Sequence, residues 1–304
     1  MSWKFELVHG PLGRPLGGLA WDGKAMLASD INDSTILAFD PSDGKTTAWR
    51  KYTNRTNGIA FGPDALYGCQ EGSRRVIRIL ADGSSAITTT RMDGLCHNQP
   101  NLLVLDRKGR VWFSDPRHPV LPSGPQVFPW LDHQSVLRLT LGGRPHTEWH
   151  IERMTFDTAS PRGVALSPDE KTLYVSETRN ERGGVRELRA YSILSDGTLG
   201  EFTVLHTFGA DARGIHRGSE GLCVDKEGNI LACAGWKRSG PGPLIYVFSA
   251  SGAVLGTHAV PADVPLNCAF GDPDLSSLYV TTADGSLFRA RSTGHTGHLL
   301  YPSK

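Results

Sequence analysis

The chain has 304 residues and a formal net charge of +1. Its Lys and Arg residues are scattered and form no basic stripe, so we expect no nucleic-acid partner. The first residues, MSWKFELVHG, lack the apolar core of a signal peptide, and no stretch is long and apolar enough to cross a bilayer. The five cysteines show no metal-binding spacing, which fits a reducing compartment. These features predict a cytoplasmic protein with no membrane partner.

Six copies of one pattern follow along the chain. Each copy is an apolar segment, a tight turn, a second apolar segment, a loop and a third apolar segment. In chain order the copies open at Gly17, Asn57, Asn101, Arg162, Glu220 and Asn267. Four-stranded blades need roughly 40–50 residues each, so the two longest intervals must carry insertions. Turns rich in Gly and Asp without convincing helical periodicity indicate an all-β chain. The sequence therefore predicts a six-bladed β-propeller.

The segment WKFELV, which begins at Trp3, has no repeat of its own. We expect it to complete the last blade and close the ring, so that no long sheet edge stays exposed. Residues 117–134 form a Pro- and Gly-rich insertion, which we interpret as a lid over the channel mouth. We find no linker composition, so a single domain over residues 1–304 is expected.

The opening residues predict a polar site. The innermost strand of each propeller blade runs along the central channel, so its first residue should lie at one mouth. Five of the six openings are polar, as in a small-molecule pocket, although Asn also suits the entry to a strand for purely structural reasons. The residues expected to orient a substrate include four amides and two loop histidines, and they are Asn57, His97, Asn98, Asn101, His216 and Asn267.

The two histidines have open alternatives. Either His97 or His216 could act as a base near neutral pH, or could simply bond a backbone carbonyl. Two glutamates, Glu71 and Glu177, end second strands at corresponding places, and we interpret them as blade-turn residues.

Four longer segments carry a family resemblance. They are NQPNLLVLDRKGRVWFSDP from Asn98, SPRGVALSPDEKTLYVSET from Ser160, GSEGLCVDKEGNI from Gly218 and PLNCAFGDPDLSSLYVTT from Pro265. These segments resemble motifs of the gluconolactonase, regucalcin and luciferin-regenerating-enzyme family of six-bladed propellers, over essentially the whole chain. The resemblance implies a hydrolase that opens sugar lactones or, in some members, cleaves organophosphates. It also implies one divalent cation, such as calcium or zinc, at the channel mouth.

The cation ligands of that family are largely replaced here. By position, the family's first-blade Glu falls on Gly17, the Asn of its fourth blade on Arg162, and the Asp of its fifth blade on Glu220; Asn101 is unchanged. A hard dication prefers several oxygen ligands, whereas an arginine stays cationic at any accessible pH. We therefore hypothesise that Arg162 replaces the cation, either polarising a carbonyl oxygen or clamping a carboxylate, and pairs with Glu220 across the channel. The rival hypothesis is a cation retained by Asn101, Glu220 and water.

The sequence thus predicts a hydrolase that opens a lactone or related cyclic ester. In this reading Glu220 is the general base that activates water, Arg162 is the electrophile, and no organic cofactor takes part. Two alternatives stay open: a propeller that binds a small molecule without chemistry, and a hydrolase of another bond, such as a phosphotriester or a cyclic amide.

Overall fold

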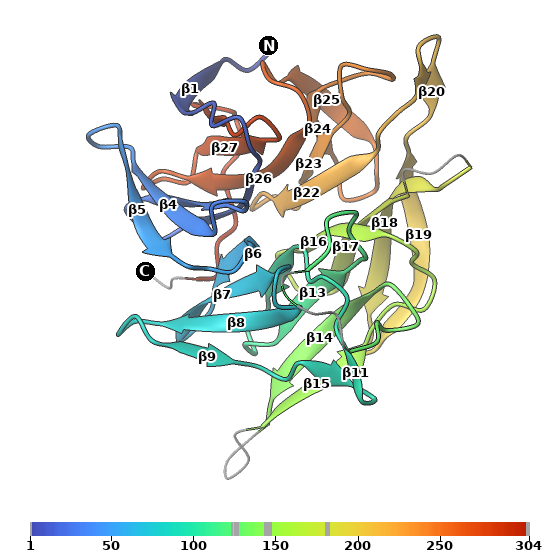
Figure 1. Cartoon of the computed structure of the whole chain (residues 1–304). Coiled ribbons are helices and arrows are strands. Elements are labelled where there is room, and N and C mark those ends of the chain that lie inside the picture. The colour runs from blue at the N-terminus through green and yellow to red at the C-terminus, as the bar shows by residue number, and fades with distance from the viewer. Residues whose placement is uncertain (1, 123, 125–127, 143–147, 180–182, 302–304) are drawn as a thin grey trace.

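The computed structural model describes residues 2–122, 124, 128–142, 148–179 and 183–301. These residues form strands, turns and loops, and none of them lies in a helix, so the described part also contains no membrane-spanning helix. Six four-stranded antiparallel sheets are arranged around a central axis (Figure 1). The chain is therefore a six-bladed β-propeller, as the repeats predict.

The first three blades follow the chain from the second strand onward. Their strands, from the channel outward, are β2 (Leu16–Trp21), β3 (Met26–Asp30), β4 (Thr35–Asp40) and β5 (Lys45–Lys51); β6 (Thr56–Phe61), β7 (Ala65–Gln70), β8 (Arg75–Leu80) and β9 (Ser85–Ile87); and β12 (Leu103–Leu105), β13 (Val111–Asp115), β14 (Ser135–Leu141) and β15 (Trp149–Arg153).

The last three blades repeat this order, and the sixth takes its outer strand from the N-terminus. Their strands are β16 (Pro161–Leu166), β17 (Thr172–Thr178), β18 (Arg186–Ile193) and β19 (Leu199–Thr207); β22 (Ser219–Val224), β23 (Ile230–Ala234), β24 (Leu244–Phe248) and β25 (Val254–Ala259); and β26 (Pro265–Gly271), β27 (Ser277–Thr282), β28 (Leu287–Ala290) and β1 (Phe5–His9). Two short hairpins, β10 (Arg91–Met92) with β11 (Leu95–Cys96) and β20 (Ala210–Asp211) with β21 (Gly214–Ile215), stand in the loops before the third and fifth blades.

Burial along each blade explains the sequence pattern. The inner strands β2, β6, β12, β16, β22 and β26 contact one another in a closed ring. Second strands such as β3 and β13 are buried along their whole length, because a neighbouring blade covers each face. The outer strand β5 is largely exposed. Continuous apolar runs therefore mark the second strands, and polar residues mark the rim.

The N-terminal strand closes the ring. Strand β1 pairs antiparallel with β28, placing Phe5 opposite Ala290 and Glu6 opposite Arg289. The Arg289 guanidinium forms an ion pair with Glu6. Ahead of this strand, the Trp3 ring stacks on His258 with a centroid distance of 3.7 Å. The predicted closure by WKFELV is confirmed.

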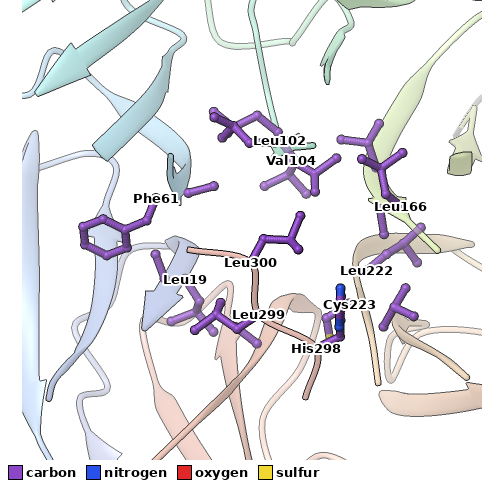
Figure 2. A pocket seen from close by; sticks show the side chains of 18 of the residues that line it. Leu19, Phe61, Leu102, Val104, Leu166, Leu222, Cys223, His298, Leu299 and Leu300 are labelled. Atoms are coloured by element: carbon purple, nitrogen blue, oxygen red, sulfur yellow. The ribbon is translucent and has the colours of Figure 1, made fainter. Parts of the chain in front are cut away.

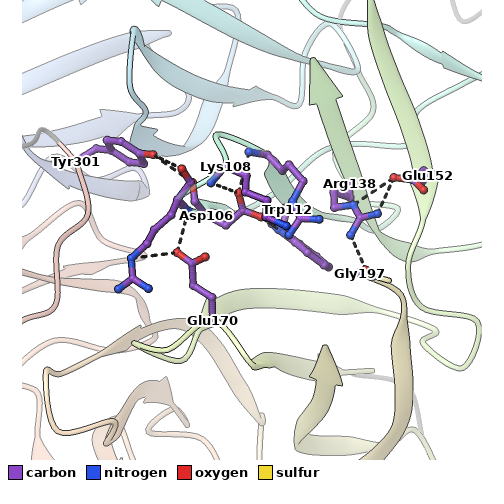
Figure 3. Close-up of polar contacts among 10 residues, drawn as sticks. Asp106, Lys108, Trp112, Arg138, Glu152, Glu170, Gly197 and Tyr301 are labelled. Atoms are coloured by element: carbon purple, nitrogen blue, oxygen red, sulfur yellow. Dashed lines mark hydrogen bonds and ion pairs between the residues drawn. The ribbon is translucent and has the colours of Figure 1, made fainter. Parts of the chain in front are cut away.

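A C-terminal segment, residues 295–301, crosses the channel at the end where the inner strands finish, which the sequence analysis did not predict. Near its start, the backbone N–H of Lys226 donates to the Thr296 carbonyl at 2.9 Å. At its other end, the Tyr301 hydroxyl donates to the Asp106 carbonyl at 3.3 Å (Figure 3). Asp106 itself is fixed, since its carboxylate accepts the Trp112 indole N–H at 2.9 Å. We call residues 295–301 the C-terminal strap.

Candidate active site

The six opening residues lie side by side around one mouth of the channel. Most of the inner strands are bulged at this point, which turns the opening residue away from the regular ladder. From the first blade to the third, Gly17 lies against the Asn57 side chain, and the Gly58 N–H donates to the Asn101 carbonyl at 2.8 Å. The Ser114 hydroxyl then donates to the Arg162 carbonyl at 2.5 Å.

The second half of the ring is equally close. A Cβ atom on Gly163 would collide with the Glu220 carbonyl oxygen, and one on Gly221 would collide with the Asn267 side chain. The Thr281 hydroxyl donates to the Gly17 carbonyl at 2.8 Å and completes the circle. Glycine after the opening residue lets neighbouring inner strands approach, and this packing gathers positions that are far apart in sequence.

Gly17 shows why the first blade carries no acidic group here. A Cβ atom at this position would collide with Oδ1 of Asn57 and would lie 2.8 Å from the Ile31 side chain. The Asn57 side chain therefore occupies the space that a glutamate at position 17 would need.

A different carboxylate, that of Glu71, lies beside the opening residues Asn57 and Asn101. Its Oε1 accepts hydrogen bonds from Nδ2 of Asn57 at 2.8 Å and from Nδ2 of Asn101 at 3.3 Å. Its Oε2 lies 3.4 Å from the Arg55 guanidinium, and the residue is 2% exposed. Our interpretation of Glu71 as a turn residue missed these contacts. Its position at the end of a second strand was visible in the sequence, but its partners across two blades were not.

Glu220 and Arg162 do not pair with each other. In the part of the chain that the structure describes, Glu220 forms its ion pair with Arg217, three residues earlier. The expected pairing across the channel is therefore not formed. Among the described residues, the Nε atom of Arg162 is buried and has no hydrogen-bond partner.

A histidine from the Pro-rich insertion joins this group. The backbone N–H of His118 donates to Oε1 of Gln99 at 2.8 Å, and its Nδ1 lies 3.3 Å from the Val120 N–H. Burial lowers the pKa of His118; the charges of Glu71 and Glu220 oppose this shift. The imidazole therefore lies within electrostatic range of both carboxylates. Sequence reasoning identified the insertion that carries His118 but missed the residue.

His97 and Asn98 hold the loop that enters the third blade. His97 has no exposed surface, its Nε2 lies 3.0 Å from the Thr89 carbonyl oxygen, and burial lowers its pKa to about 4. The Asn98 amide donates to the Asp115 carbonyl at 3.0 Å and to the His133 carbonyl at 2.8 Å. Their side chains thus bond backbone groups, and a direct substrate contact would require this loop to move.

His216 and Asn267 also bond the backbone. Nδ1 of His216 accepts the Gly218 N–H at 2.8 Å, and its Nε2 lies 2.7 Å from the Pro241 carbonyl oxygen. Burial lowers the pKa of His216, so the ring is neutral at pH 7 and positions the loop before Glu220. Oδ1 of Asn267 accepts the N–H of Cys268 at 2.9 Å.

The donors at the mouth do not fit a divalent cation. Among the described residues, no three His, Cys, Asp or Glu side chains are grouped as metal ligands. The amides of Asn57 and Asn101 turn their NH₂ groups, which cannot coordinate a metal, toward Glu71. Each carboxylate of the ring is already next to a guanidinium, Glu71 beside Arg55 and Glu220 beside Arg217. We therefore assign no chemical step to a metal ion.

Residues 17–284 match the family model described as the SMP-30/gluconolactonase/LRE-like region. The chain belongs to this family. A gluconolactonase of Zymomonas mobilis is 29% identical over 242 residues, which cover 78% of this chain and 63% of the relative. The chain thus aligns with less than two thirds of that relative's length. A pentonolactonase of Haloferax volcanii is 28% identical over 285 residues, covering 92% of this chain and 82% of the relative.

Solved structures agree on the fold. The structure of a gluconolactonase from Xanthomonas campestris superposes with a TM-score of 0.74 at 28% identity, covering 95% of this chain and 89% of the other. A calcium-binding regucalcin from Agrobacterium tumefaciens gives a TM-score of 0.73 at 15% identity, covering 98% and 96%. At that identity, the second match supports the propeller alone.

Proposed function

We propose that this protein hydrolyses a lactone at the polar mouth of the channel. The observation that carries the proposal is the closed ring of opening residues, in which Nε of Arg162 is without a hydrogen-bond partner among the described residues. The names of the relatives from Zymomonas, Haloferax and Xanthomonas support a sugar lactone as the substrate class.

The reaction divides into roles that these side chains are able to perform. The Arg162 guanidinium takes the place of the family's cation, donating hydrogen bonds to the lactone carbonyl oxygen and stabilising the negative charge that develops there. Glu220 accepts a proton from a water molecule, whose oxygen attacks the carbonyl carbon. The ring C–O bond then breaks, and the proton passes from Glu220 to the departing alkoxide. The product is the open hydroxy acid.

The amides of the mouth orient the ring hydroxyls of the substrate. Asn57 and Asn101 hold Glu71 through their NH₂ groups, so they present a fixed set of donors and acceptors. His118, whose pKa responds to the charges of both Glu71 and Glu220, adds a polar group from the Pro-rich insertion. His97 and His216 support the loops that carry these positions.

The assignment of the base is tested with proton release from a panel of sugar lactones in weak buffer. Glu220→Gln should lower kcat/KM at least a hundredfold, because the variant cannot accept a proton. Glu227→Gln, an exposed carboxylate of the same blade, is the matched control and should leave the rate unchanged. Unchanged activity in Glu220→Gln would remove Glu220 as the base.

The replacement of the cation by Arg162 is tested separately. Purified protein, dialysed against chelator and then against a calcium and zinc mixture, should retain less than 0.1 equivalent of metal and full activity. Stoichiometric metal with activity that depends on it would favour the rival site of Asn101, Glu220 and water, and would end the Arg162 hypothesis.

A second candidate function is binding without chemistry. It is favoured by the ion pairs that already occupy Glu71 and Glu220. A lactone or its hydroxy acid that binds saturably, while no lactone, phosphotriester or cyclic amide is hydrolysed, would establish this alternative.

A further inference from the structure

The far half of the central channel contains a cavity of about 190 Å³. Its walls are the middle and final residues of the inner strands together with the C-terminal strap (Figure 2). The side chains that face it are mostly aliphatic, and those that carry the argument are Leu19, Leu102, Val104, Leu166, Leu222 and Leu300. Apart from Asn267, which lines both, the side chains that are given a role at the mouth do not line this space.

We propose that this cavity is a second binding site, for a small uncharged molecule that has an apolar body and one hydroxyl or carbonyl group. The volume supports the size, because apolar cavities of about 150 Å³ bind benzene while they exclude water. A ring the size of phenol fits this space, whereas a sugar would leave its hydroxyl groups without partners against aliphatic walls.

His298 supplies the single polar contact. Its Nε2 is buried and has no hydrogen-bond partner, and the residue lines the cavity beside Cys223 (Figure 2). Burial lowers the pKa of His298, so the ring is neutral and able to donate or accept one hydrogen bond. A buried polar nitrogen without a partner is costly, and a ligand hydroxyl would satisfy it.

The other polar side chains of the lining are already engaged. The Ser167 hydroxyl donates to Asp169 at 2.6 Å, and Oε1 of Glu170 accepts the Arg107 N–H at 2.8 Å. Oδ1 of Asn267 accepts the N–H of Cys268. Of the polar side chains that line the described cavity, His298 is thus one with a buried ring nitrogen that has no hydrogen-bond partner.

The C-terminal strap forms one wall of the cavity. Its first part is held by His295, whose Nδ1 lies 2.7 Å from Oδ2 of Asp225, and its last part by Tyr301. Leu300 projects between these anchors toward Val104 (Figure 2). An occupant would therefore contact the strap and several blades at once, and should stabilise the folded state.

Phenol and benzene are the probes for this site, titrated by calorimetry and by the shift of the thermal midpoint. The wild-type protein should bind one phenol saturably. Leu300→Trp fills the cavity and should weaken both probes at least tenfold. His298→Phe removes the hydrogen-bonding nitrogen and should weaken phenol about fivefold, as expected for one lost hydrogen bond, with benzene affected less than twofold.

The controls separate binding from damage to the fold. Each variant is compared with wild type by circular dichroism and by its thermal midpoint without ligand. If Leu300→Trp does not fold, the methyl resonances of Leu300 and Leu222 in the wild-type protein give the same information, because phenol in the cavity must shift them. No saturable binding to the wild type, binding that survives Leu300→Trp unchanged, or methyl resonances that phenol does not shift would overturn the proposal and leave a water-filled channel.

Discussion

The two ends of the central channel are made by the same six strands and have opposite chemistry. At the mouth the opening residues, at or next to the start of these strands, are mostly Asn, Arg and Glu, and charged groups such as Arg55 and Arg217 gather around them. At the far end the strands finish in large apolar residues, namely Trp21, Phe61, Leu105, Leu166, Val224 and Phe270. About five residues of strand separate the ends, a length of roughly 15 Å.

This contrast teaches how one fold keeps two sites independent. Because the mouth depends on residues at or next to the start of each strand, a substitution there leaves the last residues in place. The packing differs as well: the mouth is held by glycines that let backbones meet, whereas the far end has a cavity that the strap covers. Substitutions at the mouth should therefore change catalysis and the spacing between neighbouring backbones, whereas substitutions at the far end should change only packing.

Removal of the guanidinium at the mouth should have the largest effect. Arg162→Ala is expected to lower kcat/KM for a sugar lactone by 10²–10³, about 3–4 kcal/mol, because the developing oxyanion loses its donor. Arg162→Lys should recover part of the rate, since it restores the charge without the planar pair of donors. Thermal midpoints should stay near wild type, and activity within threefold in Arg162→Ala would contradict the assigned role.

Acid should destabilise the folded protein through His97, which holds the loop that enters the third blade. The pKa of His97 is lowered by burial to about 4, so in the pH range between 6.5 and 4 the unfolded chain binds a proton that the folded chain does not. The titration of His97 therefore leaves the free energy of unfolding unchanged above about pH 6.5 and lowers it by about 3 kcal/mol as the pH drops to 4.

Urea unfolding at pH 7, 5.5 and 4.5 measures this loss. Other groups titrate in the same range, so the measurement is the difference between wild type and His97→Gln, which lacks the imidazole. The variant should lose less stability on acidification than wild type. Parallel pH curves for the two proteins would show that His97 does not carry the effect.

A methyl group between two inner strands should cost less. In Gly163→Ala the new Cβ collides with the Glu220 carbonyl oxygen, so the two blades must separate; we expect a loss of about 2 kcal/mol together with reduced activity. Gly209→Ala is the matched control, because its Cβ meets nothing within 4 Å, and it should be neutral within about 0.5 kcal/mol. Equal stability of the two variants would argue against tight packing at the mouth.

The smallest effect is expected at the apolar end. Leu300→Ala should lower the free energy of unfolding by about 1 kcal/mol, because this side chain is only partly buried and borders a cavity. Lactone hydrolysis should be unchanged. Leu255→Ala on the exposed strand β25 serves as the control and should change neither quantity. A loss of activity in Leu300→Ala would show that the two ends are coupled.

The sequence was sufficient for the architecture because each blade repeats a local signal. Apolar runs, Gly- and Asp-rich turns and their spacing predict six blades, and the unpaired segment WKFELV predicts the closing strand. The convergence of Asn101, Arg162 and Glu220 follows from the fold, and their chemical roles stay predictions.

Contacts between blades could not be predicted from the sequence. Whether Glu220 meets Arg162 or Arg217 depends on side-chain direction at a bulged strand end, which no local pattern encodes. Glu71 binds Asn57 of its own blade and reaches Asn101 across a blade boundary, and His118 comes from an insertion whose described residues form no strand. The strap was missed because residues 295–301 have neither a strand period nor a repeat that would indicate what they cover.

The sixth sheet combines the first strand of the chain with three of its last. During synthesis on the ribosome, β1 emerges almost a whole chain length before β28, its partner, exists. The earlier blades have their own four strands and are able to form in order as they are made. We therefore expect the joining of β1 to β28 to be the final step of assembly, because β1 lacks this partner until β28 has been made.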